Sequence, residues 1–206
     1  MDIEDEIRSV GIIVAHPDDE TLWAGGTILM HPEWRCSIFT ICRADDPDRA
    51  PRFKRAVCRY GAQGRMAGLD DGLAQNPLTD AELEQALLEL VGEAQFDLLL
   101  THGARGEYSR HRRHEEVSRA VVGLWQQGRL GARELWLFAY EDGEGEYLPQ
   151  ADQAADLIVD LPAAVWETKY RIIGDIYGFA NDSWEARTTP ATEAFRKVRR
   201  SADEGF

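Results

Sequence analysis

An imidazole and three carboxylates stand together early in the chain, in the hexapeptide AHPDDE of residues 15–20. A second polar segment begins at His102 and ends in the run HRRH, which puts His111 and His114 three positions apart. On a helix, that spacing places both imidazoles on one face. Because four of the chain's five histidines fall in these two segments, we expect the segments to form one shared site.

Histidine and carboxylate side chains are common ligands of a catalytic zinc ion, which takes three ligands from the protein and leaves a position for water. Zinc lowers the pKa of that water toward neutrality and polarises a carbonyl group under attack. The water also needs a base that is not itself a ligand, and two consecutive aspartates can supply one of each. A further histidine can protonate a leaving nitrogen or stabilise an oxyanion. Such ligand sets also accept Fe²⁺ and other divalent metals.

Each segment also has a simpler interpretation. Asp18 or Asp19 is suited to cap the helix that follows, and Glu20 would favour the positive end of its dipole. The HRRH run is also typical of a solvated basic loop that leads into a helix. A helix cap accounts for one carboxylate, but it does not account for two adjacent ones beside a histidine.

Both polar segments directly follow apolar runs that predict buried strands. Residues 10–14 precede the hexapeptide, and residues 97–101 precede His102. Further strands are predicted at 37–42, 134–140 and 157–160. Helices are predicted at 21–30, 52–63, 115–127 and 163–177, and another helix is predicted to follow the TDAE capping box at 79–82. The alternation predicts an α/β fold with a mostly parallel sheet and helices on both faces. Ligands of such sheets bind beyond the carboxyl ends of the strands.

The length of 206 residues suits one domain that covers residues 1–206, and no linker or repeat interrupts it. The acidic, glycine-containing stretch 142–155 is predicted to be a loop. We expect the polar tail after about residue 181 to be loosely packed, although Trp184 within it is a candidate for a pocket or an interface. Three cysteines without a C-x-x-C pair favour free thiols over disulfides or a thiolate zinc site.

The formal net charge of −14 argues against nucleic acid and against an anionic membrane surface as partners. No stretch reaches the apolar length of a membrane span. The acidic N-terminus lacks the basic and apolar regions of a secretory signal, so we expect a cytoplasmic protein. The partner indicated instead is a small molecule, and the sequence does not predict the oligomeric state.

The hexapeptide after a first buried strand, followed about a hundred residues later by H-x-x-H after another, resembles the PIG-L or LmbE-like family of zinc-dependent N-deacetylases. The similarity runs from about Val10 to Ala139. It implies a Rossmann-like three-layer fold with a mostly parallel sheet. Many members read GEYGHPxH in the second motif, whereas residues 106–114 here read GEYSRHRRH. Arg112 and Arg113 thus replace a proline and an acidic residue.

The resemblance also implies a role for each polar residue. His16, Asp19 and His114 match the family's metal ligands. Asp18 matches the base that activates the water, and His111 matches a histidine that assists the tetrahedral intermediate or the leaving amine. Contacts with the substrate are expected from Arg43, Glu107, Tyr108 and Arg110.

We therefore expect a zinc-dependent amide hydrolase that deacetylates an N-acetylated amino sugar of the N-acetylglucosamine type. Two alternatives stay open. One is a zinc amidase that acts on another N-acyl substrate, such as an S-conjugate amide, or on a substrate with an anionic group such as phosphate that Arg43, Arg110, Arg112 and Arg113 would bind. The other is a non-catalytic Rossmann-like domain that binds a sugar or a nucleotide. A dinucleotide is disfavoured, because no G-x-G-x-x-G follows the first strand.

Overall fold

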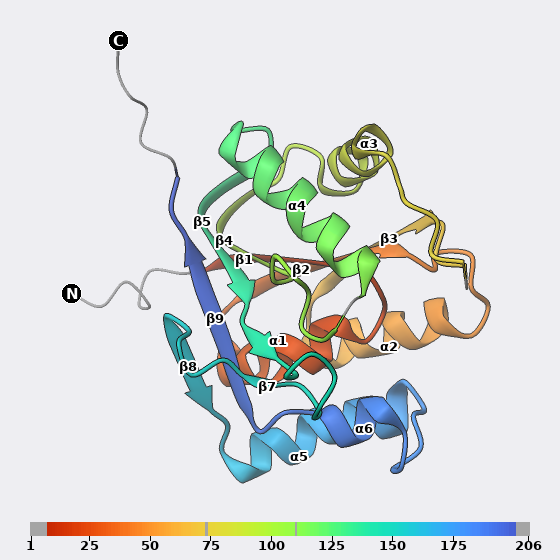
Figure 1. Cartoon of the computed structure of the whole chain (residues 1–206), viewed down its shortest axis with the longest axis vertical. Coiled ribbons are helices and arrows are strands. Elements are labelled where there is room, and N and C mark those ends of the chain that lie inside the picture. Colours follow the sequence, from red (N-terminus) through yellow and green to blue (C-terminus); the bar gives the residue numbers. More distant parts are fainter. Residues whose placement is uncertain (1–7, 73, 110, 201–206) are drawn as a thin grey trace.

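The computed structural model describes residues 8–72, 74–109 and 111–200, and its central feature is a seven-stranded sheet in the order β3-β2-β1-β4-β5-β9-β8 (Figure 1). The strands of this sheet are β1 (Ser9–Val14), β2 (Arg35–Cys42), β3 (Gln63–Leu69), β4 (Gln95–Thr101), β5 (Gly131–Phe138), β8 (Leu157–Asp160) and β9 (Thr192–Val198). A separate two-stranded ribbon consists of β6 (Tyr140–Glu141) and β7 (Gln150–Ala151).

Five strands, from β3 to β5 in this order, run parallel. β9 is antiparallel to β5, and β8 is antiparallel to β9. The chain leaves β1 toward β2 on one side and later reaches β4 on the other side. The carboxyl ends of β1 and β4 therefore flank the crevice where open parallel sheets bind their ligands. The expected α/β fold with a mostly parallel sheet is confirmed.

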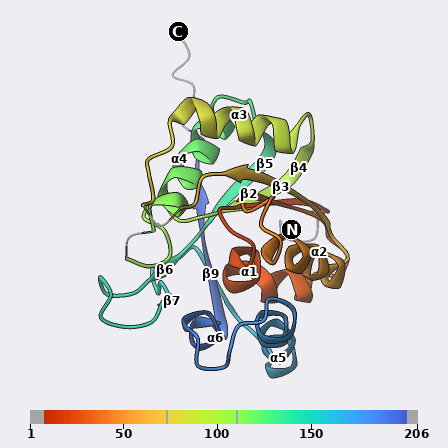
Figure 2. The same cartoon turned by 90° about the vertical axis from the view of Figure 1, so that its right-hand side faces the viewer.

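Helices cover both faces of the sheet, as the two views show (Figures 1 and 2). One face carries α3 (Asp80–Val91) and α4 (Arg112–Gln126), and the other carries α1 (Asp19–Met30), α2 (Arg49–Tyr60), α5 (Ala163–Arg171) with the π-helical turn η2 (Ile172–Ile176), and α6 (Trp184–Thr188). Side chains alternate along a strand, so Ile12 of β1 enters the core under α1 and Ile13 enters the core under α4. Burial on both faces explains the continuous apolar run of β1.

The helix after β3 begins as the sequence predicts. The Thr79 side chain accepts the Glu82 amide at 3.2 Å, and the Glu82 carboxylate accepts the Thr79 amide at 2.8 Å. These reciprocal bonds form the capping box at the start of α3. Within the described ranges, no helix is both long and apolar enough to span a membrane.

Two strands of the sheet lie where no strand was expected. β3 has the sequence QGRMAGL, whose two glycines and two polar residues, Gln63 and Arg65, conceal the strand pattern. β9 lies in the expected loose tail, yet it is hydrogen-bonded between β5 and β8, and Ala194 and Phe195 are fully buried. The expectation of a loosely packed tail therefore does not hold for Trp184–Val198.

Candidate functional site

The hexapeptide forms the tight turn between β1 and α1. Asp18 adopts the left-handed conformation there, with φ of 119°, which a non-glycine residue enters only at an energetic cost. The buried Glu20 carboxylate holds the turn, because it accepts the Asp18 amide at 3.1 Å and the Tyr177 hydroxyl at 2.6 Å. Backbone strain of this kind is concentrated at functional sites.

Three side chains from the two polar segments converge at the carboxyl end of the sheet. Asp19 Oδ2 lies 3.2 Å from His16 Nδ1 and 3.3 Å from His114 Nε2, and these two nitrogens lie 3.3 Å apart. We call these three atoms the donor triangle. A tetrahedral zinc ion with ligand bonds of about 2.0–2.1 Å needs its ligand atoms about 3.4 Å apart. The donor triangle therefore has the size that zinc requires.

A carboxylate orients each histidine of the donor triangle from behind. His114 Nδ1 donates to Glu107 Oε2 at 2.6 Å, and His16 Nε2 donates to Asp71 Oδ1 at 3.0 Å. Each bond holds a proton on the far side of the ring, so the nitrogen that faces the triangle is the one that a metal ion would bind. Histidine ligands of metal ions usually have such a partner. The residues thus fit a metal ion in their hydrogen bonding as well as in their spacing.

The Asp19 carboxylate is held in place on both of its oxygens. Trp23 Nε1 donates to Oδ1 at 3.2 Å, and the His16 amide donates to Oδ2 at 2.9 Å. Burial by itself raises the pKa of Asp19, but His114 and His102 hold it well below its ordinary value. Asp19 is therefore ionised, as a metal ligand must be.

His102 packs against the donor triangle from inside the protein. Its Nε2 accepts the Ala15 amide at 2.9 Å, and its Nδ1 donates to Glu107 at 2.9 Å. Its ring stacks on that of His114, with 3.9 Å between the centroids. His102 is fully buried and keeps Glu107 in the position that orients His114.

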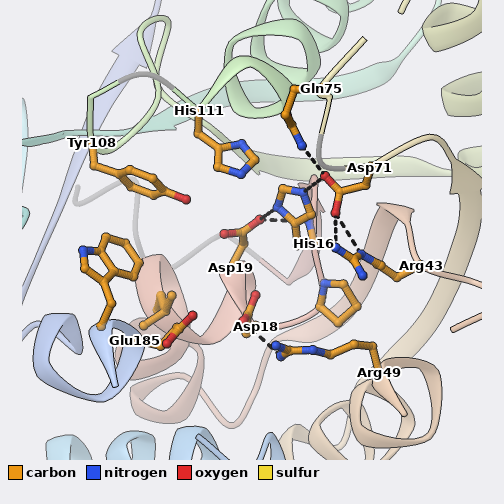
Figure 3. Close-up of a pocket in the computed structure, with 14 residues that line it drawn as sticks. His16, Asp18, Asp19, Arg43, Arg49, Asp71, Gln75, Tyr108, His111 and Glu185 are labelled. Carbon is orange, nitrogen blue, oxygen red and sulfur yellow. Dashed lines mark hydrogen bonds and ion pairs between the residues drawn. The ribbon is translucent and has the colours of Figure 1, made fainter. Parts of the chain in front are cut away.

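A cavity of about 390 Å³ opens in front of the donor triangle (Figure 3). Asp18 and His111 border it, beside His16 and Asp19. Its two sides differ in chemistry. Arg43 and Arg49 lie on one side and Tyr108 and Glu185 on the other (Figure 3). The cavity therefore combines a candidate metal centre with cationic, acidic and aromatic groups.

Asp18 contributes no atom to the groups of candidate metal ligands found among the described residues. One carboxylate oxygen, Oδ2, lies 3.4 Å from Arg49 NH1. Burial and the neighbouring Asp19 carboxylate raise the pKa of Asp18 well above its ordinary value, and Arg49 opposes this rise. Asp18 is thus a carboxyl group beside the triangle, turned to the cavity and held by one cation.

His111 lies against the other two histidines, with ring centroids 4.7 Å from His16 and 4.3 Å from His114. Its Nδ1 is buried and has no hydrogen-bond partner among the described residues. Burial, followed by the charges of His114 and His16, lowers the pKa of His111 to about 3. The ring is therefore neutral near pH 7. Its nitrogen also forms a looser group with those of His16 and His114, all within 4.8 Å of one another.

The four expected substrate contacts occupy different surroundings. Arg43 and Tyr108 line the cavity. Glu107 is fully buried, and its oxygens accept His102, His114 and the Gly103 amide, so an expected contact with substrate does not fit this position. Its place indicates that it orients His114. Arg110 lies outside the described residues.

Arg112 and Arg113, which replace the family's proline and acidic residue, do not line the cavity. Arg112 NH1 donates to the Gln75 carbonyl at 2.7 Å, and the fully buried Arg113 donates to the Asn76 carbonyl at 3.1 Å. The Gln75 side chain in turn donates to Asp71 at 2.9 Å. The two arginines therefore fix the segment that holds Asp71 against His16, which does not fit the expectation that they attract an anionic substrate.

Several residues of the site were absent from the sequence predictions, among them Asp71, Arg49 and Glu185. Asp71 follows β3, so recognition of that strand would have placed the Asp70-Asp71 pair at a carboxyl end with the two polar segments. Arg49 begins α2 in an arginine-rich stretch, and Glu185 lies in the tail. No local pattern distinguishes either of them from an ordinary surface charge.

Solved structures share this fold. The N,N'-diacetylchitobiose deacetylase of Pyrococcus horikoshii is 17% identical, with a TM-score of 0.70 over 94% of this chain and 85% of that one. A deacetylase of teicoplanin biosynthesis is 14% identical, with a TM-score of 0.69 over 95% of this chain and 100% of that one. Another neighbour is the zinc-inhibited form of the teicoplanin deacetylase Orf2, which is 14% identical, with a TM-score of 0.68 over 95% of this chain and 100% of that one. GalB, the 4-carboxy-2-hydroxymuconate hydratase of Pseudomonas putida, is 16% identical, with a TM-score of 0.67 over 97% and 100%.

A search of curated protein sequences found no match. The model of the GlcNAc-PI de-N-acetylase family, PIG-L, matches residues 12–125, which is more than half of the chain. The matched range contains the whole donor triangle together with Asp18, Asp71 and His111, and it ends before α5, α6 and β9. On this evidence, the chain belongs to the PIG-L family of GlcNAc-PI de-N-acetylase-like proteins.

Proposed function

We propose that the protein is a zinc-dependent deacetylase that hydrolyses the N-acetyl amide of an amino sugar. One observation carries this proposal: the donor triangle faces a cavity that Asp18 and His111 also line, and Asp18 belongs to no candidate group of metal ligands among the described residues. Membership of a deacetylase family supports the amide bond as the target. The chitobiose deacetylase among the structural neighbours supports a sugar as the substrate.

His16, Asp19 and His114 would hold the metal ion. A zinc ion supplies Lewis acidity, which polarises an acyl carbonyl and makes water a stronger acid. Two histidines and a carboxylate also bind Fe²⁺, and the teicoplanin deacetylase was solved in a form that zinc inhibits. The metal content of the purified protein therefore has to be measured together with its activity.

Asp18 is placed to accept a proton from water as the water oxygen attacks the acyl carbon. His111 offers a ring N–H to the oxygen that gains charge, or to the nitrogen that leaves. The C–N bond then breaks, the nitrogen takes up the proton, and acetate and a free amine are released. Tyr108 lines the same space, and its hydroxyl is directed toward His16 and Asp19 (Figure 3).

The test is amine release from N-acetylglucosamine derivatives by protein whose zinc content has been measured. Asp18→Asn should keep its zinc and lose about 10²–10⁴-fold in kcat, because a general base contributes that much. The matched control Asp182→Asn, at an exposed position, should behave like the parent. An Asp18→Asn variant as active as the parent would contradict the role of Asp18 as the general base. Zinc-loaded parent protein that releases no amine from any derivative would overturn the deacetylase.

A second candidate is the addition of water to a conjugated carboxylic acid. It is favoured by the neighbour GalB, a hydratase that matches 97% of this chain, and by Arg49, whose donors would suit a carboxylate. The Glu185 carboxylate in the same cavity opposes a substrate that carries several negative charges. Loss of ultraviolet absorbance from a 2-hydroxymuconate-type dicarboxylate, without amine release from N-acetyl sugars, would support the hydratase and overturn the deacetylase.

A further inference from the structure

One wall of the cavity comes from α6, which lies beyond the range that the family model matches. Trp184 and Glu185 of α6 line the cavity. The helix is held at both ends, because Ser183 Oγ accepts the Ala186 amide at 3.1 Å and Trp166 Nε1 donates to the Thr189 carbonyl at 3.1 Å. This wall is therefore an ordered part of the fold.

Trp184 continues an aromatic surface that begins at Tyr108. The two rings are 4.5 Å apart between centroids and tilted by 59°. Trp23 lies behind both of them, at 6.2 Å from Tyr108 and 6.5 Å from Trp184. The partly buried Trp184 thus has packed rings on one side and the cavity on the other. An aromatic side chain that lines a cavity suits a ligand ring with apolar C–H groups.

The Glu185 carboxylate points into the cavity on the side of Asp18 (Figure 3). No donor in the described part of the chain contacts it. Asp71, another carboxylate of the cavity, already accepts four hydrogen bonds from side chains around it and has no acceptor site left. Glu185 is therefore an acceptor that a ligand can use.

Arg49 faces Glu185 from the other flank of Asp18 (Figure 3). Its guanidinium lies over the Phe179 ring at 4.5 Å from the centroid, and its one hydrogen bond within the described ranges is the long contact with Asp18. A cation that uses one of its N–H donors, on Asp18, and an anion without a donor partner among the described residues thus share this part of the cavity. A charged ligand gains from one and is repelled by the other, whereas a neutral polyol can use both, because a hydroxyl donates and accepts.

We propose that Trp184 and Glu185 form the subsite for a neutral hydroxylated ring, namely the sugar ring that carries the acyl amide. Trp184 stacks against the ring, and Glu185 accepts a hydrogen bond from a ring hydroxyl. The assignment of the reacting bond rests on the proposed function, whereas the recognition of a neutral polyol rests on these two residues.

The first measurement is steady-state deacetylation of N-acetylglucosamine by zinc-loaded variants. Trp184→Ala and Glu185→Ala should each raise KM about 10-fold and leave the zinc content unchanged. Glu185→Gln keeps an acceptor oxygen and should recover most of the loss. Controls of the same residue types are Trp34→Ala, at a ring stacked on His31, and Glu167→Ala, at an exposed position of α5. Both controls should stay within about 2-fold of the parent.

The second measurement is calorimetric binding to zinc-loaded Asp18→Asn protein, in which turnover is suppressed. N-acetylglucosamine should bind more tightly than its 6-phosphate, and Glu185→Ala should reduce that preference. If sugar binding depends on Trp184 and Glu185 but protein with native Asp18 releases no amine, the proposed reaction is contradicted and the proposed subsite is supported. If amine release is equal in all variants, the proposed subsite is contradicted and the proposed reaction is supported. The subsite is also contradicted if the 6-phosphate binds more tightly than N-acetylglucosamine and Glu185→Ala does not change that preference.

Discussion

The substitution Glu107→Gln tests whether the buried carboxylate controls the metal centre. Glu107 accepts three N–H donors: His114 Nδ1 at 2.6 Å, His102 Nδ1 at 2.9 Å and the Gly103 amide at 2.8 Å. Glutamine has the same shape, but it presents one oxygen and one NH₂ group. Whichever way the amide turns, its NH₂ faces at least one of these donors, and a donor that faces another donor in a fully buried place is costly.

His114 can relieve this conflict if its proton moves from Nδ1 to Nε2. His114 would then carry the proton on Nε2, which faces Asp19, and that nitrogen would no longer be free to bind a metal. Loss of a carboxylate partner of a histidine ligand typically reduces metal affinity about 10–100-fold. A tenfold change is about 1.4 kcal/mol. We therefore expect Glu107→Gln to weaken zinc binding by about 1.4–2.8 kcal/mol.

The assay is competition for zinc between the protein and a chromophoric chelator near pH 7. The matched control is Glu193→Gln, since Glu193 is equally buried but binds Lys169 and the amides of α1. The control should lower thermal stability and leave zinc affinity unchanged. A folded Glu107→Gln protein with the parent's zinc affinity would show that Glu107 does not set the proton position on His114.

Two further predictions concern the stability of the fold. Burial by itself raises the pKa of Asp142, but the amide and hydroxyl of Ser109, at 2.6 and 2.8 Å, outweigh it and hold the pKa below its ordinary value. Asp142→Asn should therefore lower the free energy of unfolding at pH 7 by about 1 kcal/mol. Stability from a depressed carboxyl pKa is present above the ordinary value of about 3.9 and is lost as the pH falls through the folded-state value. The gap between parent and variant should shrink from pH 7 to pH 3 in urea unfolding with a chelator present, and a constant gap would contradict this reasoning. Separately, a Cβ at Gly103 would lie 2.8 Å from the Phe138 carbonyl oxygen, so Gly103→Ala should lower the free energy of unfolding by about 1–3 kcal/mol. At Gly123 of α4 a Cβ meets nothing within 4 Å, so Gly123→Ala should raise it by about 0.5–1 kcal/mol, and similar effects at both glycines would refute the steric argument.

Local patterns in the sequence were sufficient for the parallel core of the fold. Continuous apolar runs predicted β1, β2, β4 and β5, because strands buried on both faces have no polar side. β3 and β9 were not predicted, because neither strand has a continuous apolar run. β3 lies at one edge of the sheet and is only partly buried, and the outer half of β9 is polar. Their place depends on the strand that each one meets, which short-range periodicity does not contain.

The sequence by itself also determined which residue types meet at the candidate site. Residues 15–20 concentrate the acids and an imidazole after a buried strand, and the H-x-x-H spacing places His111 and His114 together at the start of α4. These features are local, since the turn after β1 and the first turn of a helix involve neighbouring residues only. The family resemblance drawn from them agrees with the match over residues 12–125.

Only the tertiary structure decided what each of these residues contacts. Asp71 contacts His16, although the two residues are 55 positions apart in the chain. Glu107, which was expected to contact the substrate, instead accepts a hydrogen bond from His114. It also placed Glu185, from the tail, in the cavity beside Asp18. The physical reason is the same in each case. A hydrogen bond between distant segments depends on how strands and helices pack, and no spacing along the chain records that packing.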